Sequence, residues 1–153
     1  MKSPDNPDVR YNLGRAFLAN NQPRDAAREW RRAVAGRPDS LTFSLNLAWL
    51  LATNTDVLSP REAIGLAGPA NKASRNEPAV LDVLAAAYAS DGRLNLAART
   101  AQLAFQRALA AKNTALATDI RRRLDAYQAA LRGGADSAGD DRRRKGHGIR
   151  DKG

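Results

Sequence analysis

Small residues recur along this chain at matched intervals, and this recurrence limits the possible folds more than any other feature of the sequence. The positions are Gly14, Ala26, Ala48, Ala63, Ala85 and Ala97. They form three consecutive units, each with two of these small residues. The first members of units one and two are 34 residues apart, as are the second members of units two and three. Helix pairs that cross at a small residue produce this spacing, because only Gly or Ala lets two helix axes come close. The sequence therefore predicts stacked helix pairs.

Gly14 illustrates the argument, because it stands inside the helical-looking segment YNLGRAFLANN of residues 11–21. A glycine inside a helix costs about 0.5–1 kcal/mol relative to Ala. We therefore expect a close contact between helices at Gly14 that outweighs this cost.

Proline and capping signals place the helix boundaries. Pro7, Pro60 and Pro78 each follow a residue suited to precede a helix, and the stretch from Ser59 to Glu62 has the form of a capping box. We expect an all-α protein with seven helices, over residues 7–20, 24–36, 41–53, 60–74, 78–90, 94–112 and 114–132. The internal turn of the second unit, around residues 54–59, carries three extra residues.

The fourth expected helix contains Gly65, Gly68 and Pro69. Pro69 has no amide hydrogen to bond to residue 65, and its ring crowds that carbonyl. The sequence therefore predicts a kink or break between Leu66 and Ala70.

The seventh expected helix has a single apolar stripe, formed by Leu116, Ile120, Leu124, Tyr127 and Leu131. A helix of this kind can cover the open end of a stacked array. We divide the chain into a lead of residues 1–6, a helical repeat domain of residues 7–132 and a basic tail of residues 133–153. The tail is rich in Gly and charge and nearly free of apolar residues, so we expect it to be disordered.

Catalytic and cofactor chemistry find little support in the sequence. The 153 residues contain no Cys, and the one histidine, His147, lies in the expected tail, which cannot hold a base against a substrate. No Gly-rich phosphate loop follows a strand, and no zinc-ligand spacing occurs. We expect no catalytic residue, no metal site and no cofactor, and hence no enzyme activity.

The three units resemble the tetratricopeptide repeat family. The matching residues are Leu13, Gly14, Phe17, Ala26, Trp30, Ala33 and Pro38 in the first unit, Leu47, Ala48, Leu51, Ala63 and Ala70 in the weaker second, and Leu84, Ala85, Tyr88, Gly92, Ala97 and Ala104 in the third. The resemblance is to bacterial members, some of which end larger multidomain proteins. It implies an α-solenoid of three repeats with a capping helix, acting as a protein-interaction scaffold or adaptor.

The resemblance also implies a concave groove that binds a peptide or helix of a partner protein. The family's groove positions fall on Tyr11, Asn12, Arg15, Leu45, Asn46, Trp49, Asp82, Val83 and Ala86. Asn12 and Asn46 can bond a peptide backbone or merely their own local backbone. Trp49 can be a binding anchor or part of the core, whereas we expect Trp30 in the core. Tyr11 and Val83 stand where the terminal-carboxylate clamp of some relatives requires basic residues.

Other partners follow from charge and from the repeat itself. The formal net charge is +9, and the basic run of residues 142–145 suggests contact with nucleic acid or an acidic partner. Asp140 and Asp141 adjoin that run, however, and no aromatic residues are interleaved for base stacking. Self-association through an uncapped end is a further alternative. The longest uncharged run, residues 41–55, is shorter than the roughly 20 residues that span a bilayer, so we expect a cytoplasmic protein without membrane insertion.

Overall fold

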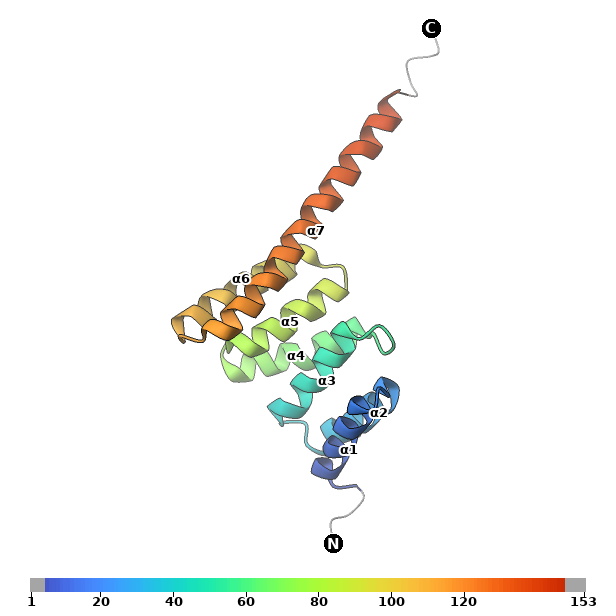
Figure 1. Cartoon of the computed structure of the whole chain (residues 1–153), viewed down its shortest axis with the longest axis vertical. Coiled ribbons are helices and arrows are strands. Elements are labelled where there is room, and N and C mark those ends of the chain that lie inside the picture. The colour runs from blue at the N-terminus through green and yellow to red at the C-terminus, as the bar shows by residue number, and fades with distance from the viewer. Residues whose placement is uncertain (1–4, 148–153) are drawn as a thin grey trace.

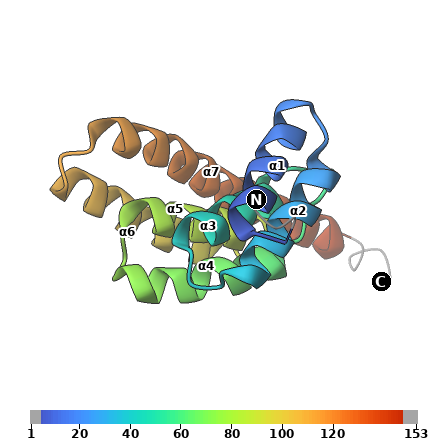
Figure 2. The same ribbon diagram turned by 90° about the horizontal axis from the view of Figure 1, so that it is seen from below.

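Seven helices and no strands make up the part of the chain that the computed structural model describes, which is residues 5–147 for the backbone and 5–134 for side chains. The helices are α1 (Pro7–Ala19), α2 (Pro23–Gly36), α3 (Leu41–Thr53), α4 (Pro60–Ser74), α5 (Pro78–Ser90), α6 (Leu94–Ala110) and α7 (Thr114–His147). Successive helices pack as antiparallel pairs, and the pairs stack from the N-terminal end toward α7, which projects beyond the body (Figure 1). Seen from below, α7 runs alongside α6 (Figure 2).

The predicted capping box of α4 does not form, because the Ser59 side chain makes no cap hydrogen bond and its hydroxyl instead donates to the Glu62 carboxylate at 3.3 Å. Two other helices do begin at a side-chain cap. Asn6 accepts a hydrogen bond from the amide of Asp8 at 2.9 Å, and Ser40 accepts one from the amide of Phe43 at 3.3 Å. Each satisfies an amide that has no partner within its own helix. The predicted ends of α1 to α6 agree with the structure to within two residues.

We predicted a kink or a break in α4, and the break is wrong, because the helix runs without interruption from Pro60 to Ser74 with Pro69 inside it. Pro69 and Gly65 both lie on the exposed side of α4. The carbonyl that loses its intrahelical bond is therefore on the side open to water, which reduces the cost of the lost bond.

The small residues that define the repeat are all buried, as predicted. The contact at Gly14 is with Trp30: a Cβ added to Gly14 would lie 2.3 Å from Cδ1 and from Nε1 of the indole. Trp30 itself is 5% exposed, in agreement with its predicted core position. Gly14 therefore leaves room for a large ring of α2 directly against the α1 backbone.

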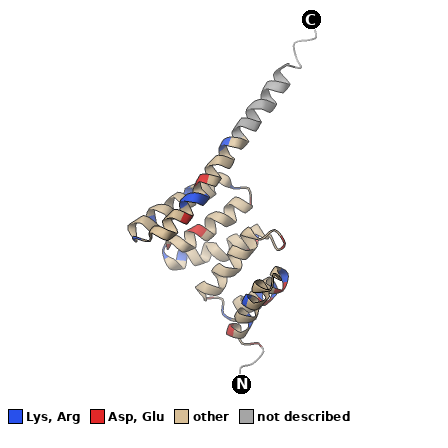
Figure 3. Ribbon diagram, in the orientation of Figure 1, with Lys and Arg blue, Asp and Glu red and all other residues tan. Residues whose placement is uncertain are grey.

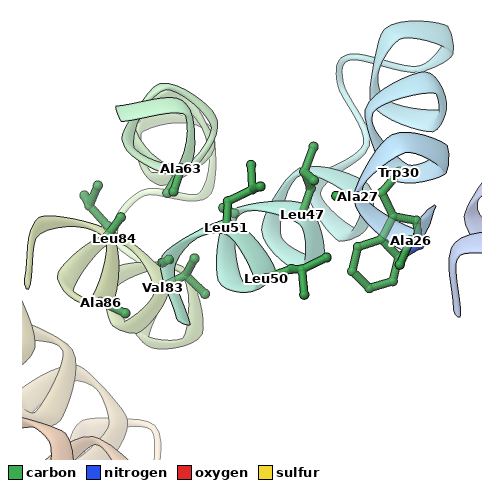
Figure 4. Close-up of a cluster of buried hydrophobic side chains, with 14 residues drawn as sticks. Ala26, Ala27, Trp30, Leu47, Leu50, Leu51, Ala63, Val83, Leu84 and Ala86 are labelled. Atoms are coloured by element: carbon green, nitrogen blue, oxygen red, sulfur yellow. The ribbon is translucent and has the colours of Figure 1, made fainter. Parts of the chain in front are cut away.

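The largest cluster of buried side chains joins α2 to α5. Trp30, Leu47, Leu51 and Leu84 belong to it, and Figure 4 shows side chains from these four helices meeting around α3. Two smaller clusters lie beneath α7.

The capping role of α7 agrees with its predicted apolar stripe. Ile120 is fully buried against Leu81 of α5, and Leu124 is 1% exposed against Ala85. The stripe thus covers the end of the last helix pair.

The predicted end of the seventh helix at residue 132 is wrong, since α7 continues to His147. The helix thus extends into the segment that we expected to be a disordered tail, and the disorder of that segment stays a prediction. Extending an existing helix gains one hydrogen bond for each residue that it fixes and avoids the costly nucleation step. The helix can therefore propagate past the part that packs against α5 and α6. The remainder of the predicted tail, residues 148–153, lies outside the described residues, as does most of the predicted lead.

Candidate functional site

Two adjoining hollows lie between α1 and α3, with Trp30 of α2 in the lining of both. The larger has a volume of about 370 Å³ and the smaller about 280 Å³, and both are lined by Leu18, Trp30 and Asn46. We call the two together the α1–α3 groove. Its complete lining is Tyr11, Arg15, Leu18, Ala19, Trp30, Asn46, Trp49, Leu50, Thr53 and Asn54.

Tyr11 ties the first helix pair to the second at this groove. Its ring stacks between Trp30 and Phe43, at centroid distances of 5.7 Å and 4.7 Å. The indole Nε1 of Trp30 donates to the Tyr11 carbonyl at 2.9 Å, and Nδ2 of Asn46 donates to the Tyr11 hydroxyl at 3.1 Å. Stacked rings with satisfied polar atoms make a rigid groove wall.

Asn46 uses its amide nitrogen within the protein. Besides the bond to Tyr11, Nδ2 donates to the carbonyl of Thr42 at 2.8 Å, one helical turn back. The local backbone bond that the sequence left open is therefore present. Oδ1 of Asn46 receives no hydrogen bond from the residues that the structure describes, so it is the atom that can accept from a ligand. Asn12, by contrast, is exposed and does not line the groove.

Trp49 is half-buried and lines the smaller hollow, so it is neither wholly core nor wholly surface. The guanidinium of Arg123, on α7, lies 5.2 Å from the centre of the Trp49 ring. A cation over an indole face is a favourable contact and orients the ring.

Arg123 also closes the groove at the third unit. Its Nε donates to Oδ1 of Asp82 at 2.8 Å, and its Nη2 donates to Oδ2 of the same carboxylate. Burial raises the pKa of the Asp82 carboxyl above its ordinary value, while Arg123 opposes this by favouring the charged form. Sequence reasoning missed Arg123. The sequence does place Arg123 three residues after Ile120 and four before Tyr127, which puts it on the packed face of the helix.

The nine predicted groove residues therefore divide into three groups. Tyr11, Arg15, Asn46 and Trp49 line the α1–α3 groove. Asn12 is exposed and Leu45 is half-buried, but neither lines the groove. The α5 residues Asp82, Val83 and Ala86 are 5%, 9% and 6% exposed. These three side chains are buried, and none of them lines the α1–α3 groove. The lining residues that the sequence did not indicate are Leu18, Ala19, Trp30, Leu50, Thr53 and Asn54.

A larger hollow of about 570 Å³ lies on the other side of α3, between α2 and α4. Its lining includes Val34, Leu66 and Pro69 but no aromatic side chain and no cation. Ser40 and Ser74, two of its polar groups, already bond to nearby backbone. This hollow lacks the anchoring groups that the α1–α3 groove has.

Metal-binding clusters and membrane-spanning helices are both absent from the described residues. No cluster of three or more His, Asp or Glu side chains in that part of the chain is arranged to hold a metal ion. None of its helices combines the length and the apolar character needed to cross a bilayer.

The fold defines the described part of the chain as an all-α solenoid of antiparallel helix pairs. No protein-family model and no curated protein matches the sequence. Solved structures of MamA do match. "MamA MSR-1 C2" is 18% identical with a TM-score of 0.61, over 94% of this chain and 82% of that one. "MamA 41-end from Desulfovibrio magneticus RS-1" is 13% identical with a TM-score of 0.58, over 83% of this chain and 78% of that one. At these identities the likeness concerns the fold.

Proposed function

We propose that this chain is a protein-interaction module that binds a short segment of a partner polypeptide in the α1–α3 groove. The observation that supports this most is Trp49, an aromatic side chain left half-buried at the smaller hollow. The adjoining larger hollow is lined by Tyr11, whose ring stacks on Trp30 and Phe43. Large aromatic side chains in partly enclosed pockets dominate the energetics of protein interfaces. No chemical step is involved, and the groove acts by shape and by burial of apolar surface.

The segment bound would contact the first two helix pairs only. The α5 residues at the third unit are buried, and Arg123 occupies the space beside Asp82. The two hollows suit individual side chains, so an extended segment fits the groove better than a whole helix would. Oδ1 of Asn46 can accept a hydrogen bond from a backbone amide of that segment.

The distribution of charge gives less support to a phosphate-binding face. Lys and Arg are interspersed with Asp and Glu on the helices (Figure 3). Many arginines in the described part of the chain pair with carboxylates, namely Arg10, Arg28, Arg31, Arg32, Arg37, Arg93, Arg121, Arg122 and Arg123. A nucleic-acid surface usually presents its cations unpaired in one patch.

Selection from a library of random short peptides, with the full-length chain immobilised, tests the proposal. Two leucines of nearly equal exposure supply matched variants: Leu18 lines the groove and is 37% exposed, and Leu96 lies on α6 and is 39% exposed. Leu18→Ser should weaken the binding of selected peptides by about tenfold, from the lost apolar contact, and Leu96→Ser should leave it unchanged. A library that yields no binders, or binders equally sensitive to both substitutions, would overturn the proposal.

A further inference from the structure

We infer that the segment bound in the α1–α3 groove is acidic, with an Asp or Glu side chain that pairs with Arg15 and a neighbouring apolar side chain that packs against Trp49 and Leu18. This inference rests on the proposed function and names the chemistry of the partner. It depends on the state of Arg15, on the charges that line the groove and on the arrangement of the two hollows.

Arg15 presents an unpaired cation at the larger hollow. It is exposed on α1, and it makes no hydrogen bond or ion pair with any residue in the described range. Arg10, on the same helix, differs sharply: it bonds Glu29 at 2.9 Å and Asp5 at 3.2 Å. A guanidinium offers five N–H donors in a planar fork that matches a carboxylate. The donors of Arg15 are therefore available to a ligand.

No acidic residue of the groove lining neutralises the charge of Arg15. None of the lining residues is an Asp or a Glu, and Arg15 is the charged residue among them. A second cation, Arg123, lies over the Trp49 ring but lines neither hollow, and it is paired with the Asp82 carboxylate. A basic segment would thus meet repulsion without compensation, whereas an acidic segment gains attraction, and complementary charge of this kind selects among partners.

The smaller hollow supplies the apolar half of the recognition. Leu18, Trp49 and Leu50 line it, and its only polar lining groups are uncharged. The two hollows share three lining residues, Leu18, Trp30 and Asn46, so they are adjacent compartments. Neighbouring side chains of one extended segment can therefore enter both, one acidic and one apolar.

The peptide selection described above provides the first test when the sequences of the selected peptides are compared with those of the starting library. Selected peptides should be enriched in Asp or Glu next to Leu, Ile, Phe or Trp. A selection that yields binders with no acidic enrichment, or with enrichment in Lys and Arg, overturns the inference while the proposed function stands. A selection that yields no binders defeats the proposed function itself.

A matched pair of charge reversals provides the second test. Arg99, on α6, is exposed like Arg15 and does not line the groove. Arg15→Glu and Arg99→Glu change the net charge equally, so any difference between them is local. Arg15→Glu should weaken selected acidic peptides by about tenfold or more, as expected for a lost hydrogen bond to a charged group, and peptides with Lys in place of the acid should regain affinity for it. Equal effects of the two reversals would refute the pairing.

Two controls complete the design. Circular dichroism checks that the variants remain folded, and Arg15→Gln serves as a milder substitution if the reversal disturbs α1. Analytical ultracentrifugation of the unliganded chain tests for a second copy in the groove. A dimer that Leu18→Ser dissociates would assign the groove to self-association and overturn the inference.

Discussion

Replacing Gly14 by Ala tests the contact that holds α1 against α2. A Cβ at this position would lie 2.3 Å from two atoms of the Trp30 indole, far inside van der Waals contact. The indole cannot move freely, because its Nε1 donates to the Tyr11 carbonyl at 2.9 Å and its ring stacks on Tyr11. Relief of the clash must therefore displace the ring, break this hydrogen bond or separate the helices.

The magnitude follows from three contributions. Overpacking a closely packed site costs about 1–3 kcal/mol, and loss of the indole hydrogen bond costs about 1 kcal/mol. The higher helix propensity of Ala returns about 0.5–1 kcal/mol. We therefore expect Gly14→Ala to lower the free energy of unfolding by about 2 kcal/mol, which for a chain of this size lowers Tm by about 4–8 °C.

Urea unfolding followed by far-ultraviolet circular dichroism measures this change, and Gly65→Ala is its matched control. Gly65 is also a helical glycine, but a Cβ there would meet nothing within 4 Å. Only the propensity term applies, so Gly65→Ala should raise the free energy of unfolding by about 0.5–1 kcal/mol. If Gly14→Ala proves neutral or stabilising like its control, the close approach of Trp30 to α1 is wrong.

Three further predictions concern ionisable groups. Burial raises the pKa of Tyr127 to about 12. The stabilisation linked to this shift is therefore full below the ordinary pKa of 10.0 and is lost as the pH rises through about 12. Ultraviolet titration should show a tyrosine that ionises late, and Tyr127→Phe should remove it. Arg123→Gln leaves the Asp82 carboxylate buried without its partner and should destabilise the fold by about 2–4 kcal/mol in urea unfolding, and adding Asp82→Asn should recover much of that loss. Arg31 donates to the Glu62 carboxylate at 2.8 Å and holds the pKa of that carboxyl below its ordinary value of 4.5. The small stabilisation from this exposed pair is therefore present above pH 4.5 and is lost as the pH falls through the lowered pKa. Nuclear magnetic resonance titration should show that the Glu62 pKa rises in Arg31→Gln.

The helices themselves could be predicted because their signals are local. Pro7 and Pro78 act within one turn of their own helix, and the spacing of Gly14 and Ala48 indicates a repeat whatever lies around it. In α4, Pro69 was expected to kink or break the helix because it loses a hydrogen bond and its ring crowds the carbonyl of residue 65. Its cost depends on whether that side of the helix faces water, which the pattern within α4 did not show.

The candidate site could be predicted only in its first half. Of the groove positions that the family resemblance implies, Tyr11, Arg15, Asn46 and Trp49 line the α1–α3 groove. Their role in binding a peptide stays a prediction. The pairing of Arg123 with Asp82 joins residues 41 positions apart on different helices, and no periodicity encodes which arginine of α7 reaches α5.

The sequence by itself determined the class of fold, the number of helix pairs and the identity of the small residues at which the helices cross, because helix propensity, capping and apolar period act over a few residues. Only the tertiary structure decided how far the groove extends. The packing angle of α7 on α5 and α6 brings Arg123 over Trp49 and onto Asp82. That angle is the result of many side chains packing together, so it exists only in the assembled fold.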